Sequence, residues 1–145
     1  MMPAENLSIL VDSSVWIAGQ RDPQKFRELI AVQTDIATCD AAVGEFEVGL
    51  YAPRDKKTRE QAREFFISTV EPAARFPHFP EDFKEAARLA GEAIFNNAAR
   101  PSFPDGLIAA TARRTNRTVW TSDETDFQAM GCKTFNPFSK HPPGQ

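Results

Sequence analysis

The chain has 145 residues, which is the length of one ordinary domain with a single core. Hydrophobic residues make up 41% and charged residues 26%, a balance that excludes a disordered chain. The net charge of −3, from 17 basic and 20 acidic residues, argues against a protein that binds nucleic acid nonspecifically over its whole surface. Apolar runs are too short to span a bilayer and no charged-then-apolar leader opens the chain, so we expect a single cytoplasmic domain over residues 1–145 without membrane contact.

The N-terminal segment is predicted to form a strand followed by helices. Residues 8–11 are largely apolar and β-branched, as in a buried central strand, and they end at Asp12. Ser13 and Ser14 follow at the turn, where their hydroxyls would cap the next helix. Pro23 then divides the helical region into two pieces.

The middle of the chain is predicted to be mainly helical. Residues 38–40 lead into a third helix with Asp40 as its candidate cap, and Pro53 ends it. A charged helix is predicted over residues 54–70. The segment that follows is rich in proline, and within it residues 73–76 are predicted to form an edge strand.

The C-terminal part is predicted to contain two helices and another buried strand. Apolar residues recur near the helical period over residues 81–99, which is the strongest helix prediction in the chain. Asp105 then opens a second, alanine-rich helix over residues 106–114. Residues 118–121 are predicted to form a buried strand, and Asp123 stands just past its end.

This alternation of short apolar strands and helices predicts an α/β fold, a three-layer α/β/α sandwich with a central parallel sheet. Sheets of this kind bind ligands beyond the carboxyl ends of their strands, where Asp12 and Asp123 both belong. The tail over about residues 139–145 is predicted to fray.

Four acids stand at the edges of apolar or small-residue segments, where a lone carboxylate is poorly placed: Asp12, Glu45, Asp105 and Asp123. Clustered carboxylates repel one another until a hard cation such as Mg²⁺ or Mn²⁺ neutralises them. Because such a cation can activate water, the pattern favours phosphodiester hydrolysis.

Three of the acids also have ordinary structural interpretations. Asp12 and Asp105 stand where helices begin, so each is also a candidate helix cap. Glu45 is also interpretable as a solvated helix residue, with Glu47 as a rival acid. The helix-weakening Gly44 beside it predicts the close approach of another backbone or of a ligand.

The fourth acid, Asp123, lies among short hydroxyl residues and two further acids, Glu124 and Asp126. Such a cluster after a strand is typical of a metal-facing loop. A capping box that uses Ser122 and Thr125 is the structural alternative.

Histidine and cysteine side chains are not expected to carry the chemistry. His78 and His141 lie outside the acidic motifs, so we expect surface histidines and no histidine-driven cleavage. Cys39 and Cys132 have no metal-type spacing and are expected to be buried free thiols.

Taken in order, these segments resemble the PIN-domain family of metal-dependent ribonucleases over nearly the whole chain. The resemblance is carried by Val-Asp-Ser-Ser-Val-Trp-Ile at 11–17, Glu45-Phe46 with Gly49, Asp-Gly-Leu-Ile-Ala-Ala-Thr-Ala at 105–112, and Thr121-Ser122-Asp123 with Asp126-Phe127. Gly106 departs from the more usual alanine-like residue. The size is similar to that of the small bacterial toxins of the virulence-associated protein C type.

The resemblance implies an endoribonuclease that uses Mg²⁺, or Mn²⁺ in its place, and acts as the toxin of a type II toxin–antitoxin system. It also implies a homodimer and a cognate antitoxin protein as partners. The family's acids correspond to Asp12, Glu45, Asp105 and Asp123, and its supporting hydroxyls to Ser13 or Ser14 and to Thr121. The resemblance leaves open whether Asp123 or Asp126 completes the metal shell.

Basic side chains are predicted to form a rim that holds RNA phosphates: Lys56, Lys57, Arg113 and Arg114, with Arg59, Arg63 and Arg117 as further candidates. Charged helix faces are also often only solvated. A phosphatase with Asp12 as nucleophile is disfavoured because position 14 is serine where a second acid is needed. The remaining alternative is a non-catalytic RNA- or protein-binding module whose acids are helix caps.

Overall fold

The protein is described by a computed structural model that covers residues 7–52 and 55–139. Within these residues, five parallel strands form one sheet in the order β3-β2-β1-β4-β5. The strands are β1 (Ser8–Val11), β2 (Asp35–Cys39), β3 (Ala74–Phe76), β4 (Thr118–Trp120) and β5 (Thr134–Phe135). The predicted central strand is therefore β1, and the predicted edge strand is β3.

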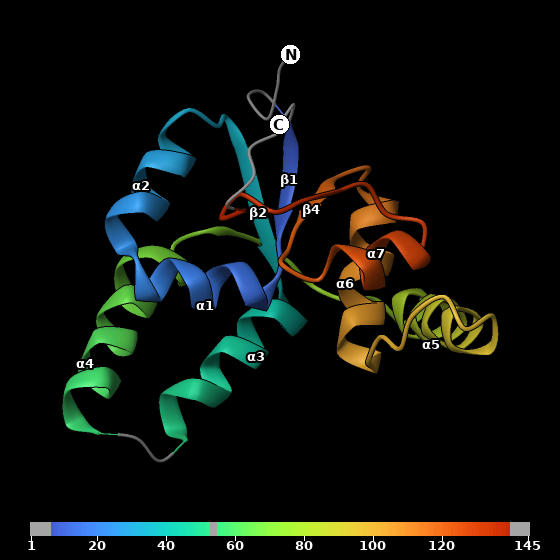
Figure 1. Cartoon of the computed structure of the whole chain (residues 1–145), viewed down its shortest axis with the longest axis horizontal. Helices are drawn as coiled ribbons and strands as arrows, with labels where there is room; N and C mark the ends of the chain where they lie inside the picture. Colours follow the sequence, from blue (N-terminus) through green and yellow to red (C-terminus); the bar gives the residue numbers. More distant parts are fainter. Residues whose placement is uncertain (1–6, 53–54, 140–145) are drawn as a thin grey trace.

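Helices cover both faces of this sheet, which confirms the three-layer α/β/α architecture (Figure 1). One group of helices comprises α1 (Ser13–Arg21), α2 (Pro23–Ala31), α3 (Asp40–Tyr51) and α4 (Lys56–Phe65), with the π-helical turn η1 (Phe66–Val70). The other comprises α5 (Pro80–Phe95), α6 (Phe103–Arg114) and α7 (Glu124–Ala129). None of the helices in the described part of the chain is both long and apolar enough to cross a membrane.

The core forms where the central strand meets the first helices. Ile9, Leu10 and Val11 are fully buried because β1 has a strand on each side and helices above and below. Trp16 of α1 contacts Phe26 of α2, with 5.5 Å between ring centroids. Such aromatic contacts fix α1, and with it the turn after β1, against the rest of the core.

The order of the strands creates a crevice at the carboxyl ends of β1 and β4. The chain leaves β1 toward β2 over one face of the sheet, whereas β4 is reached over the other face, so the connecting helices diverge between these two strands. Such a switch point is the usual ligand site of an open parallel sheet. Asp12 stands there, with its backbone N–H bonded to the carbonyl of Trp120 at 3.0 Å.

Several elements differ from the sequence prediction. Residues 38–40 were expected to lead into a helix, yet 35–39 form β2, which pairs with β1 in the register Ser8↔Asp35. Asp40 is the first residue of α3 and not its cap. The two-residue β5 and the six-residue α7 were not predicted. These segments are too short to show a period, so their structure depends on the neighbours that they pair with.

The helix bounds also differ from expectation at three places. The charged helix predicted over 54–70 is α-helical only to Phe65 and then continues as the π-helical turn; residue 54 lies outside the described residues. The helix predicted over 81–99 ends at Phe95, and Asn97 has a φ of 54°. The alanine-rich helix begins at Phe103, before Asp105, because Ser102 is its N-cap.

Gly106 allows α5 and α6 to pack closely. A Cβ atom built on Gly106 would lie 2.6 Å from the backbone oxygen of Ala86 and 3.1 Å from its Cα. Neither backbone atom can move aside without moving α5 as a whole. The glycine that departs from the family pattern is therefore explained by this contact between helices.

We predict that Gly106→Ala lowers the free energy of unfolding by about 1–3 kcal/mol, the usual cost of overpacking a core. Gly91→Ala is the matched control, because apart from its chain neighbours and the backbone of its own helix no described atom lies within 4 Å of a Cβ atom at that position of α5. The control should raise stability by up to about 1 kcal/mol, since alanine favours helix over glycine. Urea unfolding of both variants measures these changes, and equal stability of Gly106→Ala and wild type would contradict the packing argument.

Candidate metal centre

Asp12 is held in one orientation at the end of β1. Its side chain is 2% exposed, and it caps α1 by accepting a hydrogen bond from the Ser13 backbone N–H at 2.8 Å. Its other oxygen accepts bonds from the hydroxyls of Ser14 at 2.9 Å and Thr121 at 2.8 Å. The cap of α1 is therefore Asp12 itself, and the serines predicted as caps support its carboxylate.

Glu45 reaches the same place from α3 and is partly buried. The Ser13 hydroxyl donates to Glu45 Oε1 at 3.0 Å and also lies 3.4 Å from Asp12 Oδ1. One hydroxyl therefore lies between the two carboxylates, within hydrogen-bond distance of both. The close backbone approach expected at Gly44 is not found, because no described atom lies within 4 Å of a Cβ atom there. That space lies open beside Glu45.

Asp105 has a structural role as well as a place in the site. It is the third residue of α6 and forms a capping box with Ser102, whose backbone N–H donates to Asp105 Oδ2 at 2.9 Å. The Ser102 hydroxyl accepts in turn from the Asp105 backbone N–H at 3.2 Å. The cap thus uses one carboxylate oxygen and fixes the side chain, while the second oxygen takes no part in it.

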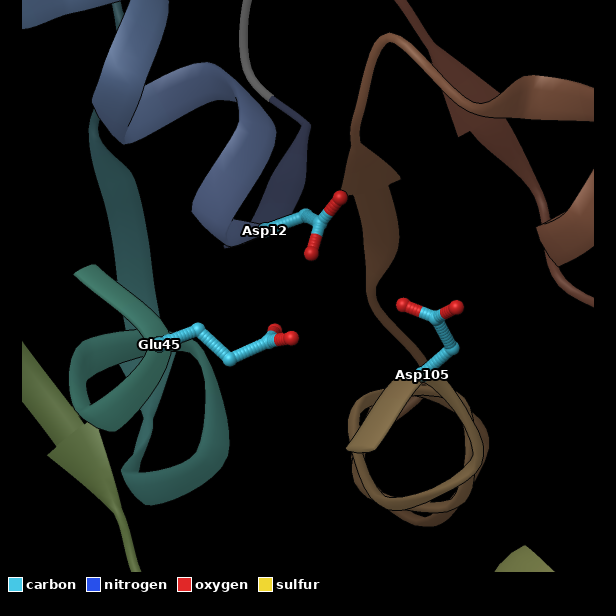
Figure 2. Close-up of side chains that lie close together, drawn as sticks. All are labelled: Asp12, Glu45 and Asp105. Carbon is cyan, nitrogen blue, oxygen red and sulfur yellow. The ribbon is translucent and has the colours of Figure 1, made fainter. Parts of the chain in front are cut away.

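The three carboxylates converge on one space (Figure 2). Asp12, Glu45 and Asp105 each offer an oxygen, and these three oxygens lie within 4.8 Å of one another. We call this group the carboxylate centre. Its members come from the end of a strand and from two different helices, so the tertiary fold brings them together.

The centre is rich in acidic groups and has no cationic partner in the described part of the chain. Burial raises the pKa of Asp12, and the charge of Asp105 adds to this effect. Burial likewise raises the pKa of Glu45, as do the charges of Asp12, Asp105 and Asp123. Within residues 7–52 and 55–139, no lysine or arginine forms an ion pair with the centre.

A hard divalent cation fits this arrangement. All three donors are carboxylate oxygens, the ligands that Mg²⁺ and Mn²⁺ favour, and no described cationic side chain neutralises their mutual repulsion. A soft metal would instead select thiolates, and neither of the two free cysteines belongs to the group of three ligand residues. Burial raises the pKa of the Cys39 thiol to about 12, so it does not ionise readily.

Asp123 lies beside the carboxylate centre but outside the group of three. It is the N-cap residue of α7, exposed, and without the side-chain capping bond expected from Ser122 and Thr125. Its backbone N–H donates to the Thr121 hydroxyl at 2.9 Å, which links it to the support of Asp12. Although the residue as a whole is exposed, partial desolvation of its carboxylate raises the pKa of Asp123, together with the charges of Asp105 and Asp126. Asp126 lies in the first turn of α7.

The predicted basic rim is divided between distant places. Lys56 and Lys57 are exposed at the start of α4. Arg113 and Arg114 lie at the end of α6 opposite to Asp105, on a helix of 12 residues that is about 18 Å long. Arg113 donates to the carbonyl of Gly131 at 3.0 Å, and Arg114 pairs with Asp82 at 3.1 Å. These two arginines therefore have structural partners away from the carboxylate centre.

Sequence reasoning missed a groove that begins at Glu45. A cavity of about 290 Å³ is lined by Ile17, Gln20, Arg21, Glu45, Phe46, Gly49, Thr58 and Ala62. It adjoins a cavity of about 530 Å³ lined by Gln20, Arg21, Pro23, Arg27, Thr58, Gln61, Glu64, Phe65 and Ser68. We call the two together the α1–α4 groove. Arg21 and Arg27 both line this groove because α1 and α2 pack against α4, and this packing cannot be read from the sequence.

His78 was expected on the surface, yet it is partly buried. Ala41 and Thr111 are its hydrogen-bond partners, so none of the acids contacts its ring nitrogens. It is therefore not a direct participant in the carboxylate centre.

Comparison with known proteins agrees with this architecture. The family model described as "PIN domain" matches residues 9–131. No curated protein matches the chain.

Solved structures share the fold at low sequence identity. FitAcB from Neisseria gonorrhoeae is 23% identical with a TM-score of 0.73, covering 89% of this chain and 97% of that chain. VapBC-5 from Mycobacterium tuberculosis, a member of the VapBC family of toxin–antitoxin systems, is 24% identical with a TM-score of 0.65, covering 92% and 97%. VapC20 from the same organism, a Sarcin-Ricin loop cleaving toxin, is 17% identical with a TM-score of 0.64, covering 86% and 96%. With the family match extending over most of its length, the chain belongs to the PIN-domain family.

Proposed function

We propose that this protein is a metal-dependent endoribonuclease that uses Mg²⁺, or Mn²⁺ in its place, and acts as the toxin of a type II toxin–antitoxin system. One observation carries the proposal: three carboxylates of a PIN domain converge within 4.8 Å without a cationic partner in the described chain. The cytoplasm is the proposed location.

Asp12, Glu45 and Asp105 would hold the cation. When bound, Mg²⁺ or Mn²⁺ supplies Lewis-acid stabilisation of phosphoryl charge and lowers the pKa of water. The chain itself supplies orientation: hydroxyls fix Asp12, and the Ser13 hydroxyl holds Glu45 beside it. Asp123, whose pKa is raised by partial desolvation of its carboxylate and by the charge of Asp105, is proposed to complete the pocket, with Asp126 as its alternative.

The α1–α4 groove is proposed to hold the RNA strand next to the cleaved bond. It begins at Glu45 and continues past Arg21 to Arg27. Neither arginine has an ion-pair partner among residues 7–52 and 55–139, so both guanidinium groups are available to phosphate oxygens. A local groove of this kind reconciles RNA binding with the net charge of −3.

A cognate antitoxin and a homodimer are proposed as the protein assemblies. The support is the similarity to FitAcB and to VapBC-5, the latter from a toxin–antitoxin system. Exposed apolar side chains on α5 offer surface for a protein contact: Phe83 is 47% and Phe95 is 86% exposed.

The alternative function is a non-catalytic RNA- or protein-binding module whose acids are helix caps. It has one observation in its favour, since Asp12 caps α1 and Asp105 belongs to the capping box of α6. Capping does not explain Glu45, which lies inside α3. A measurement of cation binding distinguishes the two functions, because only the ribonuclease requires a cation at these acids.

We predict that Asp105→Asn reduces RNA cleavage and Mn²⁺ affinity by at least about 100-fold, because even an outer partner of a metal ligand is worth 10- to 100-fold. The fold should persist, since an asparagine oxygen can still accept the Ser102 N–H. Mn²⁺ binding by electron paramagnetic resonance, cleavage of a labelled RNA and thermal unfolding measure the three effects. Glu47→Gln, on the same helix as Glu45, is the control and should cut normally. Unchanged Mn²⁺ binding with lost stability would favour the capping module.

We predict that Glu45→Gln stabilises the metal-free protein near neutral pH. The folded-state pKa of Glu45 lies above its usual value of 4.5. The charged form is therefore disfavoured by folding, and wild-type stability should rise as pH falls through the folded-state pKa and level off below 4.5. The advantage of the variant should shrink over the same range. Thermal unfolding in EDTA across this range checks the trend, and a variant less stable than wild type at about pH 8 would refute it.

We predict that Arg21→Ala raises KM for RNA by about 3- to 10-fold and changes kcat little, because a phosphate contact removed from the groove weakens ground state and transition state alike. Arg113→Ala is the comparison, since Arg113 lies at the far end of α6. Steady-state cleavage at two salt concentrations measures both variants. A larger effect at Arg113 than at Arg21 would place the RNA outside the groove.

A further inference from the structure

His78 joins α3 to α6 through both of its ring nitrogens. The backbone N–H of Ala41, in the first turn of α3, donates to Nε2 at 3.0 Å. Nδ1 lies 3.0 Å from the hydroxyl oxygen of Thr111 in α6, and that hydroxyl donates to the carbonyl of Leu107 at 3.0 Å. A residue from the loop between β3 and α5 thus connects two helices of the carboxylate centre.

These contacts determine where the protons lie. A backbone N–H can only donate, so Nε2 of His78 must be unprotonated to accept from Ala41. The neutral ring then carries its proton on Nδ1, and this N–H donates a hydrogen bond to the Thr111 hydroxyl oxygen. The Thr111 hydroxyl donates in turn to the carbonyl of Leu107. A charged ring would instead direct an N–H at the N–H of Ala41, and that bond would be lost.

The hydrogen bond from Ala41 caps α3 with a side chain that lies 37 residues further along the chain. Cys39, the N-cap residue of α3, makes no side-chain capping bond. The first N–H groups of a helix have no partner inside it, and His78 accepts from one of them. A positive ring at this helix end would also meet the positive end of the helix dipole.

Charged groups of both signs surround His78, and burial is the largest influence on its pKa. Burial lowers the pKa of the imidazole, and the charge of Arg114 on α6 acts in the same direction. Asp40 on α3 and Asp82 on α5 oppose the shift. Each of these carboxylates is already paired with an arginine, Asp40 with Arg75 and Asp82 with Arg114.

We propose that His78 is a positioning residue of the carboxylate centre: its neutral ring sets the spacing of Glu45 from Asp105, and its protonation releases α3 and weakens cation binding. Glu45 lies one turn after Ala41, on the same face of α3. A hard cation requires oxygens at about 2.0–2.6 Å, so a helix shift of about 1 Å impairs binding. The inference rests on the proposed function in that the centre must hold a cation.

The protonation state can be tested without metal or RNA. Nitrogen-15 NMR of labelled histidine in a His141→Gln background observes His78 alone, since the sequence has two histidines. We expect a neutral ring protonated on Nδ1 at about pH 7.5, with titration below the usual value of 6.5. A ring protonated on Nε2, or a charged ring at that pH, would overturn the proposal.

Mn²⁺ titration calorimetry at about pH 7.5, and at a lower pH at which the NMR titration shows the His78 ring to be charged, tests the coupling to the centre. His78→Ala should weaken Mn²⁺ binding about 10-fold at the higher pH, while His78→Gln, whose amide oxygen can accept from Ala41, should stay within about 3-fold of wild type. Glutamine does not titrate, so the ratio of wild-type to His78→Gln dissociation constants should rise at least about 3-fold at the lower pH.

The outcomes separate this inference from the function on which it rests. A constant ratio between the two pH values, or a folded His78→Ala with wild-type affinity, would overturn the role of His78 and leave the metal centre intact. Should His78→Ala fail to fold, the ratio between wild type and His78→Gln decides alone. A wild-type protein that binds no Mn²⁺ at all would overturn the proposed function itself.

Discussion

The structure depends on one buried carboxylate, that of Asp12, at the carboxyl end of the central strand. Burial of a charge is unfavourable without compensation, and no described cationic side chain compensates this one. Three short hydrogen bonds from one backbone N–H and two hydroxyls offset part of the cost and leave the carboxylate in a single orientation. The hydroxyl-rich turns after β1 and β4 are explained by this requirement.

The other two carboxylates, on the surrounding helices, likewise have no described cationic partner. Glu45 and Asp105 approach Asp12 because α3 and α6 pack against each other, with α3 also against α1 and α6 against β4. The position of α6 depends in turn on its close contact with α5 at Gly106. Packing therefore holds like charges together against their repulsion, and a cation that binds only the folded chain would stabilise it by mass action.

Sequence alone predicted the architecture and three acids that the fold brings together, Asp12, Glu45 and Asp105, because each depended on a local pattern; the fourth predicted acid, Asp123, lies outside this group of three. The strand before Asp12 is a continuous apolar run, and the helices around Glu45 and Asp105 show their period or their cap. Other features depend on pairing between distant segments. β2 is recognisable only beside β1, and the groove at Arg21 exists only once α1 and α2 pack against α4. His78 stands among prolines in the sequence, and nothing local marks its two helical partners.

The hydrogen bonds of the acids differ greatly in the length of chain that they close, and this determines when the carboxylate centre can form during folding. Asp105 is oriented by Ser102, three residues away, so its geometry arises with the first turn of α6. The bond from Thr121 to Asp12 spans 109 residues and cannot form before β4 joins β1. Closing so long a loop carries a high entropic cost, which only the assembled sheet offsets. A chain still emerging from the ribosome therefore has an incomplete carboxylate centre, and under the proposed function cleavage begins only after β4 has joined β1.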